Sequence, residues 1–331
     1  MERFALAAAV VLGFALTAAL CSLFVPLRRV LERREQQQQP VQPEQPRPAP
    51  LRAPLWGGLC AAAGTVAAVG VGWLAACVGQ PELLGSEGRL MTRLLTALAG
   101  SLAFGVVGLA EDLARMRSPA ALGLRRDVRL LLEALAAAFV LLLLQAAGCL
   151  PRGLDVPGAG YVLLGSAVPF LWAVLMVALA ECARIAERDE GTVCGAAFVA
   201  MLALMMAEAG LGVPGLAVLP AALAGALVAL LLWAFPPARL GVGCCGSLLA
   251  AGAIGCIPLS LDMTSLTVPL ALPFWAAGGL LTAQLLCAKR TGKPLRCWVK
   301  KHKMSPETVF LCSFALSAVG YILALALLRW C

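Results

Sequence analysis

Two adjacent acidic residues, Glu111 and Asp112, stand at the end of a long apolar run and could bind a divalent cation. Hard cations such as Mg²⁺ prefer oxygen ligands, and carboxylates supply them. Arg115 follows Glu111 by four residues, which is the spacing at which opposite charges pair on the surface of a helix. The sequence therefore leaves two interpretations open, a metal-binding pair or a helix end whose charges neutralise each other.

The segment 181–191 (ECARIAERDEG) carries a second group of acidic side chains. Its four carboxylates outnumber its two arginines, which would suit a metal site. However, Glu181, Arg184 and Glu187 are three residues apart and would lie along one helical face with alternating charge. Self-neutralisation and metal binding thus remain alternatives here too.

Two other motifs carry less chemistry. The segment 241–246 (GVGCCG) matches the dinucleotide-binding pattern G-x-G-x-x-G, but that function requires a preceding strand and a βαβ unit, so we exclude it. Cys244 and Cys245 are expected to pack as small apolar residues. His302, the single histidine, lies among lysines, and the sequence identifies no partner that would position it for acid–base chemistry.

The composition indicates where these residues must be held. Of the 331 residues, 61% are hydrophobic and 13% are charged, whereas soluble domains are about 25% charged. This excludes a soluble enzyme, a disordered chain and a small disulfide scaffold. Because a membrane-spanning helix needs about 20 apolar residues, we predict an all-α polytopic membrane protein that forms a single transmembrane domain over residues 1–331.

Ten apolar runs are long enough to predict about ten transmembrane helices. They cover residues 4–25, 56–78, 93–110, 129–148, 160–180, 193–208, 213–235, 245–262, 267–287 and 308–329.

The positions of the basic residues predict the orientation of these helices. The odd-numbered loops hold 21 of the 26 Lys and Arg residues, so the positive-inside rule places these loops in the cytoplasm and both termini outside. The net charge of +8 thus reflects membrane topology, and we expect no nucleic-acid partner. Within the first loop, the Gln- and Pro-rich residues 35–50 predict a flexible cytoplasmic linker.

Taken in order, three motifs resemble those of the polyprenyl-phosphate N-acetylhexosamine-1-phosphate transferases, most closely the phospho-N-acetylmuramoyl-pentapeptide transferases of peptidoglycan synthesis. Residues 54–58 (PLWGG) resemble P-T-M-G-G, and Glu111 and Asp112 stand where that family has an Asp-Asp pair. Residues 237–248 (PARLGVGCCGSL) resemble P-A-K-x-F-M-G-D-x-G-S-L. The family has ten spans with both termini outside, and it transfers a phospho-sugar from a UDP-sugar to undecaprenyl phosphate with Mg²⁺ on the cytoplasmic face.

The resemblance implies a role for individual residues. Asp112 and Glu111 would be catalytic and would bind Mg²⁺ if the protein is active, and substrate-binding positions would be Glu187, Glu190, Arg52 and His302. The implied partners are a UDP-sugar, undecaprenyl phosphate and membrane lipids, with a homodimer or a partner in envelope synthesis as further candidates. The implied location is the cell membrane, with the active-site face in the cytoplasm.

The sequence departs from the family at several of these positions. Cys244 replaces the aspartate that binds Mg²⁺ in the family, and a thiol is a poor ligand for a hard cation. Residues 181–191 lie over N-x-x-N-x-x-D-G-x-D-G, with both asparagines lost and both aspartates lengthened to glutamate, and the family's histidine triplet is reduced to His302. Glutamate carries its carboxylate one methylene further from the backbone than aspartate does, and misplacing a reacting group by about 1 Å can lower a rate roughly 10²-fold.

The sequence leaves three functions to be weighed. The first is a divergent family member with reduced or lost transferase activity. The second is an active transferase with a rearranged Mg²⁺ site built from Glu111, Asp112, Glu187 and Glu190. The third is an unrelated transporter, which is disfavoured because transporters place ionisable residues near the membrane midplane, whereas here they cluster at the ends of spans.

Overall fold

The computed structural model describes most of the chain, with gaps between its elements. The described residues are 2–38, 56–79, 89–117, 123–151, 153–156, 160–163, 165, 167–187, 191–211, 215–235, 238–291 and 306–328.

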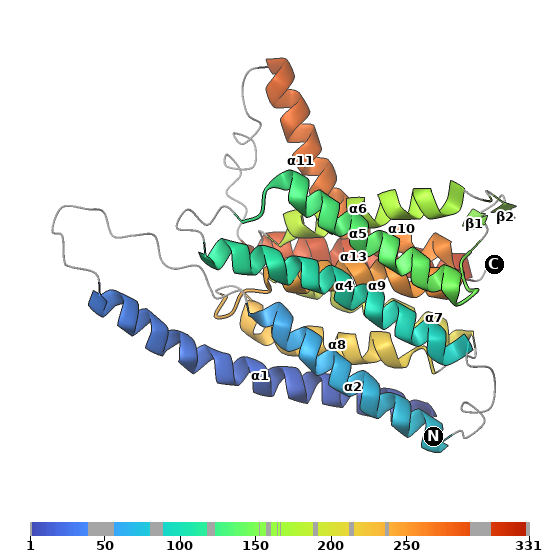
Figure 1. Ribbon diagram of the computed structural model, residues 1–331, viewed down its shortest axis with the longest axis horizontal. Coiled ribbons are helices and arrows are strands. Elements are labelled where there is room, and N and C mark those ends of the chain that lie inside the picture. The colour runs from blue at the N-terminus through green and yellow to red at the C-terminus, as the bar shows by residue number, and fades with distance from the viewer. Residues whose placement is uncertain are drawn as a thin grey trace.

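Almost all of this part of the chain is helical (Figure 1). The elements are α1 (Glu2–Gln38), α2 (Gly57–Gly79), α4 (Arg89–Arg117), α5 (Arg126–Ala146), β1 (Gly153–Val156), β2 (Gly160–Leu163), α6 (Ala167–Ala186), α7 (Thr192–Gly210), α8 (Val218–Ala234), α9 (Gly243–Ser260), η1 (Thr264–Leu266), α10 (Thr267–Leu270), α11 (Leu272–Thr291) and α13 (Pro306–Leu328). The two strands form a short antiparallel hairpin.

Within the described residues, seven helices are long and apolar enough to cross a membrane. The bent pair Thr264–Leu270 and Leu272–Ala283, with 61° between its halves, would make an eighth span. α8 is apolar but shorter, with 17 residues. The all-α polytopic membrane class is thus confirmed, while the number of ten spans stays a prediction.

Two predicted boundaries were wrong. The fifth apolar run does not start a helix at residue 160, because residues 160–163 form β2 and Gly165 has a left-handed φ of +57° before α6 begins. A single glycine in this conformation interrupts a helical run at little steric cost. In the first loop, α1 continues to Gln38, so residues 35–38 of the predicted linker are helical and residues 39–50 lie outside the described part of the chain.

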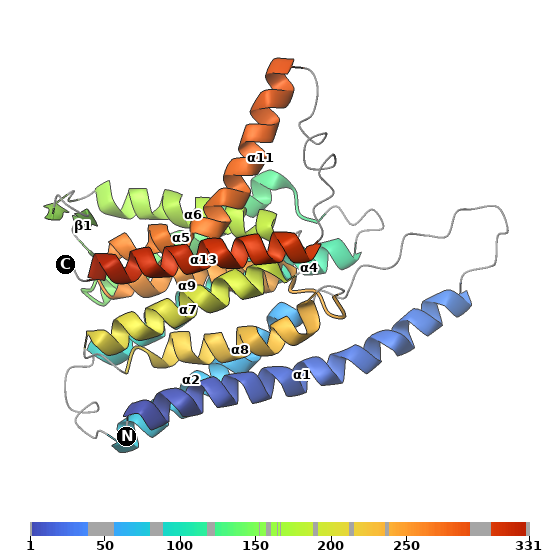
Figure 2. The same ribbon diagram turned by 180° about the vertical axis from the view of Figure 1, so that it is seen from behind.

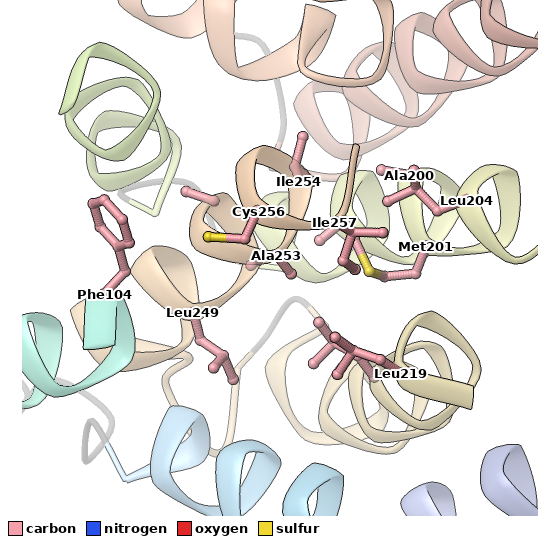
Figure 3. Close-up of a cluster of buried hydrophobic side chains, with 14 of the residues drawn as sticks. Phe104, Ala200, Met201, Leu204, Leu219, Leu249, Ala253, Ile254, Cys256 and Ile257 are labelled. Carbon is pink, nitrogen blue, oxygen red and sulfur yellow. The ribbon is translucent and has the colours of Figure 1, made fainter. Parts of the chain in front are cut away.

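α9 is the central helix of the bundle, and all of its residues are buried. It packs most extensively against α4 and also contacts α6, α2 and α7. In Figure 3, Phe104 of α4 and Met201 of α7 lie on opposite sides of it. Small residues allow the close approach that membrane helices need, because a Cβ on Gly252 would meet the Cβ of Phe104 at 3.0 Å.

Both chain ends and the β-hairpin lie at one end of the bundle in Figures 1 and 2. The last turn of α4 and the first turn of α9 lie at the other end, and α11 leans out from the side of the bundle. The fold therefore separates the chain ends from the end of the bundle at which the acidic residues of α4 and α6 are found.

Candidate active site

Asp112 caps the first turn of α9. Its Oδ1 accepts a hydrogen bond from the backbone N–H of Cys244 at 3.0 Å, and its Oδ2 accepts one from the N–H of Cys245 at 2.9 Å. The first N–H groups of a helix have no partner within the helix and carry its positive dipole, so a carboxylate is stabilised there. The side chain is only 1% exposed, and the fold thus holds Asp112 against α9 in a fixed position.

Glycines make this contact between helices sterically feasible. A Cβ on Gly108 would collide with the carbonyl group of Cys244, so α4 can approach α9 only because position 108 has no side chain. On the other side, the N–H of Gly58 donates to the carbonyl of Val242 at 2.9 Å. Gly243 starts α9 with a φ of +72°, which L-residues with a Cβ rarely adopt. The segment 241–246 thus begins a buried helix beside α2.

Cys244 joins Asp112 to a third acidic residue, Glu187. The Cys244 thiol donates to Oε2 of Glu187 at 3.4 Å, while the backbone of the same residue donates to Asp112. Glu187 follows the last residue of α6, and Cys244 is fully buried. The position at which the family has an aspartate therefore lies between two carboxylates and adds no charge of its own as a thiol.

Arg115 neutralises this group of acids. Its guanidinium lies 2.8 Å from Oε1 of Glu111, 3.6 Å from Oε2 of Glu187 and 3.9 Å from Oδ1 of Asp112. The predicted pairing of Glu111 with Arg115 along one helix is thus confirmed. The contact with Glu187 was not predicted, because it joins two helices that are distant in sequence.

A second set of ion pairs continues from Glu111. Arg129 of α5 lies 3.6 Å from Oε1 of Glu111 and 2.7 Å from Oε1 of Glu181, and Arg184 lies 2.6 Å from Oε2 of Glu181. The predicted pairing of Glu181 with Arg184 is confirmed. Glu187, expected on the same face, instead lies beside Arg115 and Cys244.

Glu133 was not among the predicted site residues, yet it belongs to this neighbourhood. It lies one helical turn beyond Arg129 on α5 and is fully buried, and neither of its carboxylate oxygens has a hydrogen-bond partner. Oε2 of Glu111 is likewise buried without a partner. An acidic residue inside an apolar run is a signal of function in membrane proteins, and that signal was available at Glu133.

The described side chains do not fit the Mg²⁺ site that the resemblance implies. Mg²⁺ requires near-octahedral oxygen coordination, but both oxygens of Asp112 already accept N–H groups of α9, and Glu111 and Glu187 face a guanidinium. Cys244 would add a soft sulfur ligand. Over the described residues, no group of three or more His, Cys, Asp or Glu side chains is arranged to hold a metal ion.

Three predicted substrate-binding residues fall outside the described part of the chain. These are Glu190, Arg52 and His302. Among the site residues that the structure does describe, Glu111, Asp112 and Glu187 lie together beside Cys244.

Comparison with known proteins gives a consistent family. The family model described as glycosyl transferase family 4 matches residues 94–262, just over half of the chain, and this range contains all four of those residues. The chain is 32% identical over 170 residues to the phospho-N-acetylmuramoyl-pentapeptide-transferase of Desulforudis audaxviator, covering 48% of this chain and 50% of that protein.

Two further relatives carry the same name. Identity to the Mycobacterium tuberculosis protein (strain H37Rv) is 28% over 265 residues, which is 72% of each chain. Identity to the Synechococcus protein (strain RCC307) is 31% over 212 residues, which is 63% of this chain and 55% of that protein. The match thus spans about half the length of two of these relatives and 72% of the third.

Proposed function

Because the chain belongs to glycosyl transferase family 4, we propose that it is a divergent phospho-sugar transferase of the cell envelope whose activity is reduced or lost. The ancestral reaction in this proposal is transfer of a phospho-sugar from a UDP-sugar to undecaprenyl phosphate, in synthesis of peptidoglycan or another envelope glycan. In this proposal the protein lies in the cell membrane with the acidic site facing the cytoplasm.

The position of Cys244 carries this proposal. Its backbone N–H lies 3.0 Å from Asp112 and its thiol lies 3.4 Å from Glu187, so a carboxylate at this position would lie between these two acids. A neutral thiol gives that place neither the charge nor the hard oxygen that a divalent cation requires. A thiol in place of an acid between Asp112 and Glu187 supports reduced activity.

Binding of a phosphate group is the part of the reaction that this site retains in our proposal. Arg115, Arg129 and Arg184 gather at one end of the bundle, and guanidinium groups bind phosphate oxygens through paired hydrogen bonds. We therefore infer that undecaprenyl phosphate still binds at this end of the bundle.

Transfer assays with the purified protein test the loss of activity. Labelled UDP-sugars, undecaprenyl phosphate and Mg²⁺ are incubated with this protein and, in parallel, with the phospho-N-acetylmuramoyl-pentapeptide-transferase of Mycobacterium tuberculosis. Because several site residues differ, we expect labelled lipid to form at least about 10²-fold more slowly than with the relative. A comparable rate would instead support the active transferase with a rearranged site.

Retained lipid binding is tested separately from activity. Undecaprenyl phosphate should raise the melting temperature of the protein in detergent, because a ligand that binds only the folded state stabilises it. Undecaprenol, which has the same chain without the phosphate, serves as the control and should have little effect. Equal effects of the two lipids would show that the phosphate is not recognised.

A further inference from the structure

Arg115 occupies the centre of the acidic site. Its guanidinium lies within 4 Å of Glu111, Asp112 and Glu187, the three carboxylates nearest to Cys244. The neighbouring Arg129 pairs with two acids and Arg184 with one. A divalent cation bridging the same three acids would have to displace this guanidinium.

Gly123, which lies just before α5 and has a φ of +70°, also contacts the Arg115 side chain. A Cβ at position 123 would lie 3.0 Å from Cγ and 3.3 Å from Nε of Arg115, so Gly123 lies in close contact with the arginine. The same Cβ would lie 3.5 Å from Oε1 of Glu111. Arg115 thus contacts Gly123 as well as the three carboxylates, and 21% of its side chain is exposed.

We propose that the guanidinium of Arg115 is the permanent cation of this site and takes the place of a divalent metal ion. One monovalent charge is sufficient for three acids because Asp112 is also stabilised by two N–H groups of α9 and Glu111 is also paired with Arg129. The neutral Cys244 is consistent with this arrangement, because a fourth carboxylate would leave the site short of positive charge. The acidic site therefore stays assembled without a metal.

This inference rests on the proposed function only in treating the site as the remnant of a transferase site. Metal response is therefore measured rather than transfer, so that the two proposals can fail separately. Labelled lipid formed by a protein that ignores Mg²⁺ would overturn the loss of activity and leave the role of Arg115 intact.

The first experiment compares melting temperatures in detergent with chelator and with millimolar Mg²⁺. Wild-type protein should change by less than about 1 °C, whereas Arg115→Met should melt lower in chelator and regain about 2 °C or more with Mg²⁺. Arg115→Lys keeps the charge and should not respond to Mg²⁺. Arg117→Met is the matched control, because Arg117 is exposed in the same last turn of α4, and it should behave as wild type.

Two results of this experiment would overturn the proposal. One is a clear rise in the wild-type melting temperature with Mg²⁺ that Asp112→Asn abolishes, since the metal would then bind beside an intact Arg115. The other is an Arg115→Met protein that elutes as a single folded species and does not respond to Mg²⁺.

A second experiment uses the unmodified protein, so it decides even if Arg115→Met does not fold. Phenylglyoxal modifies accessible guanidinium groups, and mass spectrometry reports the modification of Arg115 and Arg117 separately. We expect Arg115 to react slowly, and at the same rate with and without Mg²⁺, while exposed Arg117 reacts readily in both conditions. Faster modification of Arg115 in Mg²⁺ would mean that the metal displaces it, which contradicts a permanent role.

Discussion

Asp112 and Cys244 are 132 positions apart in the chain, yet the backbone N–H of Cys244 donates to Oδ1 of Asp112 at 3.0 Å. The Cys244 thiol donates instead to Glu187, at 3.4 Å. One residue thus connects the end of α4, the start of α9 and the end of α6 through different atoms. The backbone part of this connection is independent of the side chain at position 244, which explains how a cysteine can stand there without loss of the helix cap.

Asp112→Asn should destabilise the protein by about 1–3 kcal/mol, because the amide can accept only one of the two N–H groups and turns its own NH₂ toward the other. A lower melting temperature in chelator, where no metal contributes, reports the loss. The control is Asp127→Asn, an exposed acid in the first turn of α5, for which we expect a loss below about 1 kcal/mol. Equal losses at the two positions would contradict the capping role of Asp112.

Cys244→Asp should create a divalent-cation site, since it adds a carboxylate between Asp112 and Glu187. Without an ion the crowded carboxylates repel, so the variant should melt lower in chelator and recover in Mg²⁺. Recovery should be weaker when Asp112 is also changed to Asn, because one carboxylate of the new site is then lost. The two substitutions should deviate from additivity by about 0.5 kcal/mol or more, as neighbouring sites do. Cys244→Ser, which adds no charge, is the control. Strictly additive effects would mean that the two residues do not share a site.

Gly108→Ala should separate α4 from α9, because the new Cβ collides with the carbonyl group of Cys244. Overpacking of this kind costs about 1–3 kcal/mol. Gly70→Ala is the matched control, since Gly70 is an exposed helical glycine of α2 and a Cβ added there would have nothing within 4 Å. The melting temperature should fall for Gly108→Ala and stay level or rise for Gly70→Ala. A stable Gly108→Ala protein would show that the two helices can pack further apart.

The membrane orientation gives a further prediction. In a cysteine-free background, a thiol at Gln38 should be labelled only from the cytoplasm and one at Leu154 only from outside, because the basic loops lie on the side of Gln38. Gln38 is the last residue of α1, and Leu154 lies in β1. The end of α1 and the β-hairpin lie at opposite ends of the bundle (Figures 1 and 2). Labelling of both from one side would exclude the topology. An impermeant maleimide applied to intact cells and to inverted vesicles makes the measurement.

Much of the fold followed from the sequence, because bilayer thickness and helical periodicity are local constraints. The apolar runs at 4–25 and 56–78 correspond closely to the spans Phe4–Val25 and Gly57–Val78. The boundary near residue 160 was missed because apolar composition alone does not distinguish β2 from the start of α6. Gly165, which lies between these two elements, has a positive φ that apolar composition does not predict.

The sequence by itself determined the membrane class, and it placed Glu111 with Arg115 and Glu181 with Arg184 at spacings that allow ion pairs within one helix. Residues three or four apart on a helix are neighbours whatever the rest of the chain does. Only the tertiary structure decided that Asp112 caps α9, that Glu187 faces Arg115, and that Cys244 lies between the two acids. These contacts depend on how closely α4, α6 and α9 pack, and that distance is set by glycines such as Gly108, whose effect appears only when the opposing backbone is in place.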